Sequence, residues 1–162
     1  MAYTVIRTDS LSGTDQRADL FSVRLCDAEG KHIAVENGVI AKLGSLEEGE
    51  REVYTATLAQ AGDDLDECVL VAGVEVMYDE RLRNLEDFIN EAGKATRGYA
   101  FRNRNFYALT KEGFVDGVVP EVGGEVGIGK DGKHDAAATG VGVCKAIEIA
   151  GRYTYYVIQV KK

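Results

Sequence analysis

Apolar and polar residues alternate along most of the chain, which is the pattern of strands that are half-buried in a sheet. In residues 20–25, for example, the apolar side chains of Phe21, Val23 and Leu25 occupy every second position. Together with strand-type composition, such patterns predict strands at 20–25, 32–35, 39–43, 51–58, 68–76, 98–102, 106–110, 143–150 and 153–160. Glycine, asparagine and aspartate separate these stretches as turn formers, so the chain is predicted to be mainly β.

Two of the predicted turns join neighbouring strands into hairpins. Gly151-Arg152 separates the last two stretches and has glycine first, as a type II′ turn requires. Both faces of 153–160 are largely apolar, so we expect this C-terminal hairpin to lie inside a sheet or at a subunit contact. Asn103-Arg104-Asn105 is expected to form the loop of a second hairpin, between 98–102 and 106–110.

One segment has the period of a helix. Residues 79–92 place Leu82, Leu85, Phe88 and Ile89 at spacings of three and four, and Gly93 suits the position that follows a helix. The apolar stripe covers less than half of the circumference, so it should pack one-sidedly against a sheet. We therefore predict an α+β domain dominated by strands, a small barrel or sandwich with this one amphipathic helix and the C-terminal β-hairpin.

The length of 162 residues corresponds to one domain. Residues 1–19 begin with a strand-like stretch and continue with turn formers, so we interpret them as an extended N-terminal arm. Residues 20–162 then form a single β-rich domain. Within it, 113–142 contain nine of the nineteen glycines and the only proline, which indicates a loop-rich subregion.

The net charge is −8, from 27 acidic and 19 basic residues, which argues against a nucleic-acid-binding protein. The charge is nevertheless segregated, with an acidic run at 45–80 and a basic one at 94–111. Each run is either a solvated face or one pole of a subunit whose basic hairpin docks on an acidic surface. No apolar stretch is long enough to span a membrane and the first 20 residues lack an apolar core, so we expect neither a membrane contact nor a secretory signal.

Two short motifs match nucleotide- or RNA-binding signatures only in part. Residues 124–130 have the GxxxxGK spacing of a phosphate-binding loop, but Asp131 stands where serine or threonine is required, so we expect a hairpin turn. Residues 97–101, RGYAF, match the start of an RNA-recognition signature. Arg102 and Arg104 then occupy positions that the signature gives to apolar and aromatic residues, so no nucleic-acid partner is expected.

The residues that usually carry catalysis or bind metals form no motif. Cys26, Cys68 and Cys144 are odd in number and contain no CxxC pair, so we expect reduced, buried thiols. The acidic residues at 63–67 lack the spacing of a calcium-binding loop. An enzyme would need His32 or His134 beside one of the cysteines. We predict no catalytic residue, no metal site and no cofactor, and we do not expect an enzyme.

Five segments carry a family resemblance. They are 49–54 (GEREVY), 75–85 (EVMYDERLRNL), 88–93 (FINEAG), 97–99 (RGY) and 155–160 (YYVIQV). In these segments the chain resembles the capsid decoration proteins, also called cement or head-stabilising proteins, of tailed bacteriophages that infect Gram-positive bacteria. The segments are packing and turn motifs without catalytic content, so they point to a family and not to a site.

The resemblance implies a structural virion protein that binds the outer surface of an icosahedral phage capsid and stabilises the shell. Its expected partner is the major capsid protein, with homo-oligomers on the lattice, after synthesis in the cytoplasm of the host bacterium. The alternatives are a head–tail adaptor or tail component and, third, a small cytosolic enzyme. Candidate capsid contacts lie on the arm and on the basic hairpin: Tyr3, Val5, Arg7, Arg97, Arg102 and Arg104.

Overall fold

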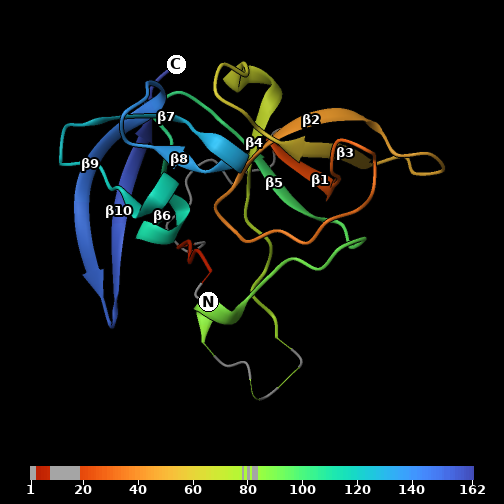
Figure 1. Ribbon diagram of the computed structural model, residues 1–162, viewed down its shortest axis with the longest axis horizontal. Coiled ribbons are helices and arrows are strands. Elements are labelled where there is room, and N and C mark those ends of the chain that lie inside the picture. Colours follow the sequence, from red (N-terminus) through yellow and green to blue (C-terminus); the bar gives the residue numbers. More distant parts are fainter. Residues whose placement is uncertain (1–2, 8–18, 78, 80, 82–83) are drawn as a thin grey trace.

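The computed structural model describes residues 3–7, 19–77, 79, 81 and 84–162. It contains a closed five-stranded barrel and a separate five-stranded sheet, which lie side by side (Figure 1). Strands make up 43% of the structure and helical turns 10%, so the mainly β prediction is confirmed. The C-terminal hairpin is also formed as predicted.

The barrel is built from the N-terminal two-thirds of the chain. Its order is β1-β3-β2-β4-β5, and antiparallel pairing of β5 with β1 closes it. β1 and β3 are parallel, and the other neighbours are antiparallel. The strands are β1 (Leu20–Leu25), β2 (Ile40–Leu46), β3 (Val53–Leu58), β4 (Cys68–Val71) and β5 (Thr96–Ala100).

Small and branched side chains fill the barrel. Val23, Ala56, Val69 and Val71 belong to its core cluster and are almost fully buried. Gly98 on β5 faces the same interior, where an added Cβ would lie only 2.7 Å from Cγ2 of Val69. Glycine is therefore needed at this position because β5 closes the barrel against side chains that already occupy the space.

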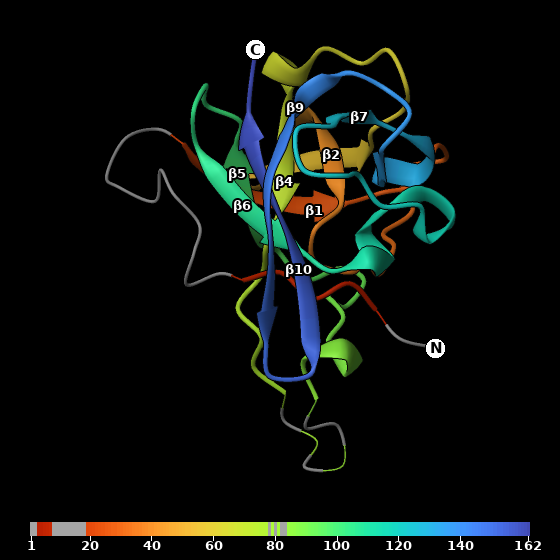
Figure 2. The same cartoon turned by 90° about the vertical axis from the view of Figure 1, so that its left-hand side faces the viewer.

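The second sheet has the order β6-β10-β9-β7-β8, with antiparallel neighbours. Its strands are β6 (Phe106–Leu109), β7 (Glu125–Ile128), β8 (His134–Asp135), β9 (Gly140–Ala150) and β10 (Tyr153–Val160). Gly151 has a φ of +61°, which fits the first central position of a type II′ turn. The distal half of the β9–β10 hairpin projects from the rest of the sheet (Figure 2).

The main hydrophobic core lies between the sheet and the barrel. Phe101, Tyr107, Leu109, Phe114 and Ile158 are among its large buried members. On the other face of the sheet, Val5 packs with Ala108 and Tyr155 in a smaller cluster. The described part of the N-terminal segment, residues 3–7, runs beside β6, where Ile6 pairs with Leu109.

The helix predicted over 79–92 is wrong where the structure describes this stretch. Its only helical turn there is the short 3-10 helix η3 (Leu85–Asp87), and Asn90 then forms a β-bridge with Val35. The expected helical residue Leu82 lies outside the described residues. Tertiary contacts override the helical period because Asn90 bonds to the backbone of residue 35 through both its main chain and its side chain.

The hairpin predicted over 98–110 is also wrong. β5 pairs with β1 and β4, whereas β6 pairs with β10, so residues 101–105 cross from the barrel to the second sheet.

The predicted strand 32–35 is reduced to single bridges at His32 and Val35. The glycine-rich stretch contains β7, β8 and the short 3-10 turns η5 (Val115–Gly117) and η6 (Lys130–Gly132), and η4 (Lys111–Gly113) ends at its first residue. The remaining 3-10 turn, η2 (Leu65–Glu67), precedes β4.

Candidate functional site

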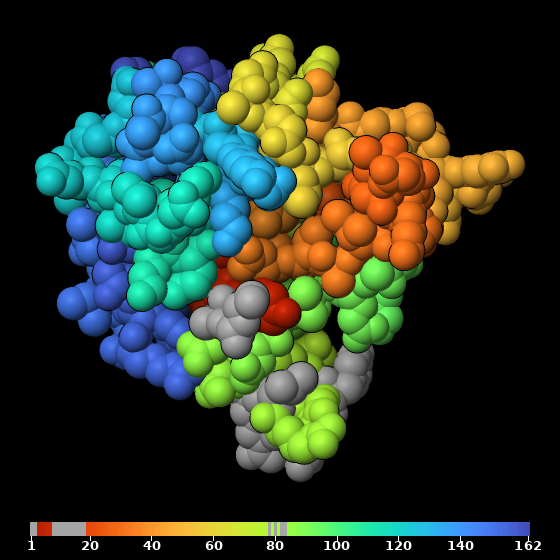
Figure 3. Space-filling view, viewed as in Figure 1, coloured from red at the N-terminus to blue at the C-terminus, as the bar shows by residue number. Residues whose placement is uncertain are grey.

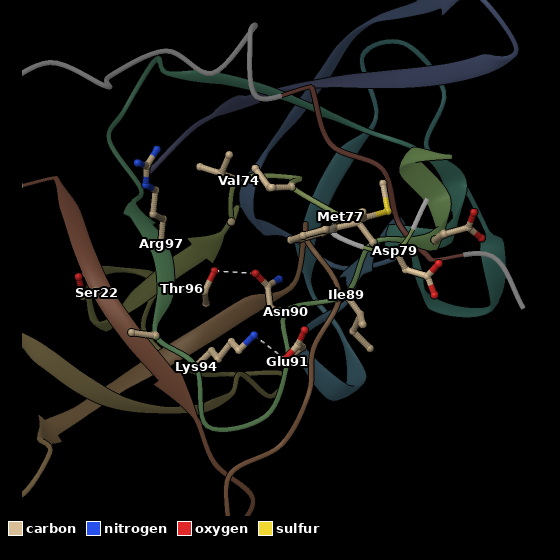
Figure 4. A pocket seen from close by; sticks show the side chains of 15 residues that line it. Ser22, Val74, Met77, Asp79, Ile89, Asn90, Glu91, Lys94, Thr96 and Arg97 are labelled. Atoms are coloured by element: carbon tan, nitrogen blue, oxygen red, sulfur yellow. Dashed lines mark hydrogen bonds and ion pairs between the residues drawn. The ribbon is translucent and has the colours of Figure 1, made fainter. Parts of the chain in front are cut away.

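A cleft of about 720 Å³ lies beside the barrel, where the chain leaves β4 and returns to β5. One wall contains Ser22 of β1 with Thr96 and Arg97 of β5, and the other is formed by described residues of the segment 72–95 (Figure 4). In the space-filling view the molecule is hollowed between the barrel and this segment (Figure 3). Ligand-binding pockets commonly have volumes of this size.

Buried amide side chains fix the segment 72–95 to the barrel at both ends. The side chain of Asn37 is fully buried; its Nδ2 donates to the carbonyl of Gly73 at 3.0 Å, and its Oδ1 accepts from the Gly73 N–H at 2.8 Å. Asn90 Nδ2 donates to Asn37 Oδ1 at 2.9 Å. Thr96 Oγ1 donates to Asn90 Oδ1 at 2.6 Å, so one network joins the start and the end of the segment.

Gly73 is required at the centre of this network. An added Cβ would overlap both Asn90 Oδ1 and Thr96 Oγ1. The close approach lets the backbone of Gly73 bond directly to the amide of Asn37. The cleft therefore has a rigid base, because every partner in the network is held by more than one hydrogen bond or by a strand.

The lining of the cleft combines exposed apolar side chains with a charged rim. Val74 and Val76 are 53% and 54% exposed, and Met77 and Ile89 lie on the same segment. The rim consists of Asp79, Asp87, Glu91, Lys94 and Arg97. Lys94 Nζ forms an ion pair with Glu91 at 2.7 Å, and the Arg81 guanidinium lowers the pKa of Asp79. No described lining residue is a histidine or cysteine.

The three thiols are not activated. Burial raises the pKa of Cys26 and Cys144, and it raises the pKa of Cys68 to about 11. A β-bridge does place Cys26 opposite His32, but the His32 ring contacts Glu47 Oε1 at 3.0 Å and the Cys26 thiol donates to the carbonyl of Arg24. These thiols stay protonated at neutral pH, whereas a nucleophilic cysteine needs its thiolate.

The acidic loop 63–67 forms ion pairs with lysines. Asp63 Oδ1 lies 2.9 Å from Lys42 Nζ and Asp66 pairs with Lys162; these contacts lower the pKa of both carboxyl groups. Asp64 caps the 3-10 helix η2 by accepting from the Asp66 N–H. Within the described ranges, no group of three or more histidine, cysteine, aspartate or glutamate side chains is suited to hold a metal ion.

The candidate contact residues fall into two separate places. The Tyr3 N–H donates to the carbonyl of Glu86 in η3 at 3.0 Å, and Arg7 pairs with Glu148 of β9 at 3.1 Å. Val5 is only 1% exposed, so in this conformation its side chain packs internally and is not available to a partner.

The three basic residues from the predicted hairpin lie along β5 and the crossing that follows it. Arg97 lines the cleft and is exposed, and Arg102 pairs with Asp19 at 2.6 Å. Arg104 is exposed, and its backbone lies in the left-handed region with a φ of +73°.

The apolar lining of the cleft was not predicted as a site. The alternation within Val74-Glu75-Val76, at the end of an apolar run, was a signal for it.

Both partial motifs have structural roles. In the RGYAF stretch, Phe101 is buried in the main core and Tyr99 packs against it, so no aromatic platform faces solvent. Most of residues 124–130 form strand β7, and the hairpin turn that joins β7 to β8 follows at η6.

Comparison with protein-family models, with curated proteins and with solved structures finds no match. Among the residues that the structure describes, no helix is long and apolar enough to cross a membrane.

Proposed function

We propose that this protein is a structural virion component that binds the outer surface of an icosahedral phage capsid and stabilises the shell. The observation that carries the proposal is the cleft, in which exposed valines cover a base fixed by buried amides. Such a surface accommodates an apolar loop of a second protein. The protonated, buried thiols support a binding role over nucleophilic catalysis.

The expected partner is the major capsid protein. An apolar side chain of its surface would contact Val74, Val76 and Ile89, while the rim of the cleft carries both charge signs to orient it. Each cleft is small, so a single contact would be weak. Many copies that also contact one another on a lattice bind more tightly than each would alone, because later contacts form at a high effective concentration.

The direct test is co-sedimentation of the purified protein with undecorated capsids, with copy number measured by quantitative gel staining. Saturable binding at a copy number that matches the capsid subunits supports the proposal. Binding of only a small ring of copies would contradict it and indicate a head–tail adaptor or tail component. Absence of binding would also contradict it and would direct attention to a substrate screen.

A pair of variants tests whether the cleft is the contact. Val76→Asp places a charge among the apolar lining residues and should weaken capsid binding at least about tenfold, which corresponds to about 1.4 kcal/mol. Val122→Asp is the control, because Val122 is 61% exposed and is not part of the cleft lining. Equal binding by both variants would show that the cleft is not used.

A further inference from the structure

The outer edge of β9 is free along its distal half. At Cys144 this edge is still bonded, since the Cys144 N–H donates to the carbonyl of Gly124 at 2.9 Å and its carbonyl accepts from Gly123 at 2.7 Å. Beyond that point, β10 pairs with the other side of β9, and no described strand pairs with residues 146–150 on this side. Figure 1 shows the distal half of β9 at the outer margin of the molecule.

The free stretch has sharp limits at both ends. At one end, Ile158 pairs with Cys144 and Val157 with Ala146, so Lys145 is a bulge that interrupts the ladder. At the other end the Gly151-Arg152 turn reverses the chain. Glu148 is therefore the middle residue of an uninterrupted stretch of edge strand.

The backbone of this stretch can accept another strand. Ala150 pairs with Tyr153 across a two-residue turn, where the flanking pair exchanges hydrogen bonds, and Glu148 pairs with Tyr155 two residues further along. Because alternate residues of an antiparallel strand direct their backbone groups to opposite sides, Ile147 and Ile149 direct theirs outward. Their side chains are 45% and 80% exposed, whereas natural edge strands usually carry charged or proline residues that prevent pairing.

We propose that this edge pairs with the same edge of a second copy of the chain, antiparallel, about a two-fold axis beside Glu148. The edge is self-complementary in this register: only when Glu148 faces Glu148 of the second copy does the whole stretch 146–150 pair without reaching a bulge or a turn. Ile147 then faces Ile149 of the second copy, and the two exchange both backbone hydrogen bonds. The two sheets become one continuous sheet.

The charges near the axis fit this arrangement. Like charges directly opposite each other on neighbouring strands are destabilising, and Glu148 would meet its own copy. However, Glu148 already pairs with Arg7 at 3.1 Å, and the Arg7 guanidinium also lies 5.7 Å from the centre of the Tyr155 ring. Each carboxylate thus brings its own cation, and the group of four charges at the axis is neutral in total.

Oxidative cross-linking tests the register. Residues at a non-hydrogen-bonded antiparallel position have Cα atoms about 4.5 Å apart, which is within the range for a disulfide. Under mild oxidation, Glu148→Cys should form a covalent dimer that is visible on a non-reducing gel.

Thr154→Cys is the matched control, because Thr154 is exposed on β10 of the same hairpin but lies away from the axis. The native thiols are buried, and the wild type should give no dimer band. No cross-link in Glu148→Cys, or equal cross-linking in both variants, would overturn the proposed register.

Sedimentation equilibrium tests the association without cross-linking. The wild type should dimerise in a concentration-dependent manner, and Ile149→Lys should raise the dimer Kd at least about tenfold, since it puts like charges at the paired edge. The fold should tolerate this change because Ile149 is mostly exposed. Val76→Lys, in the cleft, is the control and should dimerise normally. A wild type that stays monomeric, or an Ile149→Lys variant that dimerises normally, would overturn the proposal.

Discussion

His134 shows how a single buried side chain links the fold to pH. It lies in the main core, where its Nε2 is 2.7 Å from the Tyr107 hydroxyl and its ring packs against Phe114. Complete burial lowers the pKa of His134 from 6.5 to about 4, because desolvation disfavours the imidazolium. The same burial raises the pKa of Tyr107. The pair is thus neutral at physiological pH and serves as a packed, hydrogen-bonded unit.

The depressed pKa predicts acid sensitivity. Between pH 6.5 and about 4 the unfolded chain binds a proton at His134 that the folded chain does not bind, so the free energy of unfolding falls as the pH falls through this window. The contribution of His134 to this loss should reach about 3 kcal/mol and stop growing below about pH 4, where His134 is protonated in both states. Urea unfolding at a series of pH values measures it.

His134→Gln should flatten this pH dependence, whatever its effect on absolute stability. His32→Gln is the control, because His32 is partly exposed and pairs with Glu47. If the wild type and His134→Gln lose stability in parallel between pH 6.5 and 4, the acid sensitivity does not come from His134.

At the scale of elements, the segment 72–95 depends on the barrel for its conformation. Residues expected to form one face of a helix instead contact different parts of the molecule. Leu85 packs against the small cluster that contains Val5, Phe88 is buried, and Ile89 lines the cleft. The buried amides of Asn37 and Asn90 hold both ends of this segment in place. The shape of the cleft follows from these hydrogen bonds and not from local propensity.

Asn37→Ala should therefore loosen the whole segment. The change removes the buried partner of the Gly73 N–H, of the Gly73 carbonyl and of the Asn90 Nδ2 group. Because buried polar groups without a partner are costly, the free energy of unfolding should fall by about 2–3 kcal/mol. Amide hydrogen exchange should also become faster in 72–95. Asn103→Ala is the control, since Asn103 is exposed. Unchanged exchange in Asn37→Ala would show that other contacts fix the segment.

At the scale of the whole molecule, the uneven charge distribution provides a second way to test capsid binding. Eleven acidic residues lie within 45–80, and the basic residues between 94 and 111 follow β5 and its crossing to the second sheet. Oppositely charged surfaces steer association and fix orientation, and salt screens them. Capsid binding through the basic side should thus weaken as the ionic strength rises.

Replacing Arg97, Arg102 and Arg104 together by alanine should weaken capsid binding and reduce its salt dependence. Co-sedimentation at several salt concentrations measures both effects. The control with the same change in charge replaces Lys31, Arg51 and Lys130, which are exposed outside the basic run 94–111. Unchanged occupancy of capsids by the first variant would remove these arginines from the contact surface.

The local pattern of the sequence determined most of the strands and the position of the last turn. β1 matches its predicted residues, and the β9–β10 hairpin forms around the Gly151-Arg152 turn. Alternation and turn chemistry are properties of a few neighbouring residues, so they can be recognised without the rest of the molecule. The absence of a CxxC pair and of a complete phosphate-loop motif was equally visible from neighbouring positions.

Apart from the β9–β10 hairpin, tertiary structure decided how those strands pair. β5 and β6 are neighbours in the chain yet belong to different sheets, and residues with a helical period became an irregular wall of the cleft. The cleft itself brings Ser22, Val74 and Arg97 together from distant positions in the sequence. Such pairings depend on which long-range contacts bury most apolar surface and satisfy most buried polar groups, and no local stretch of sequence carries that information.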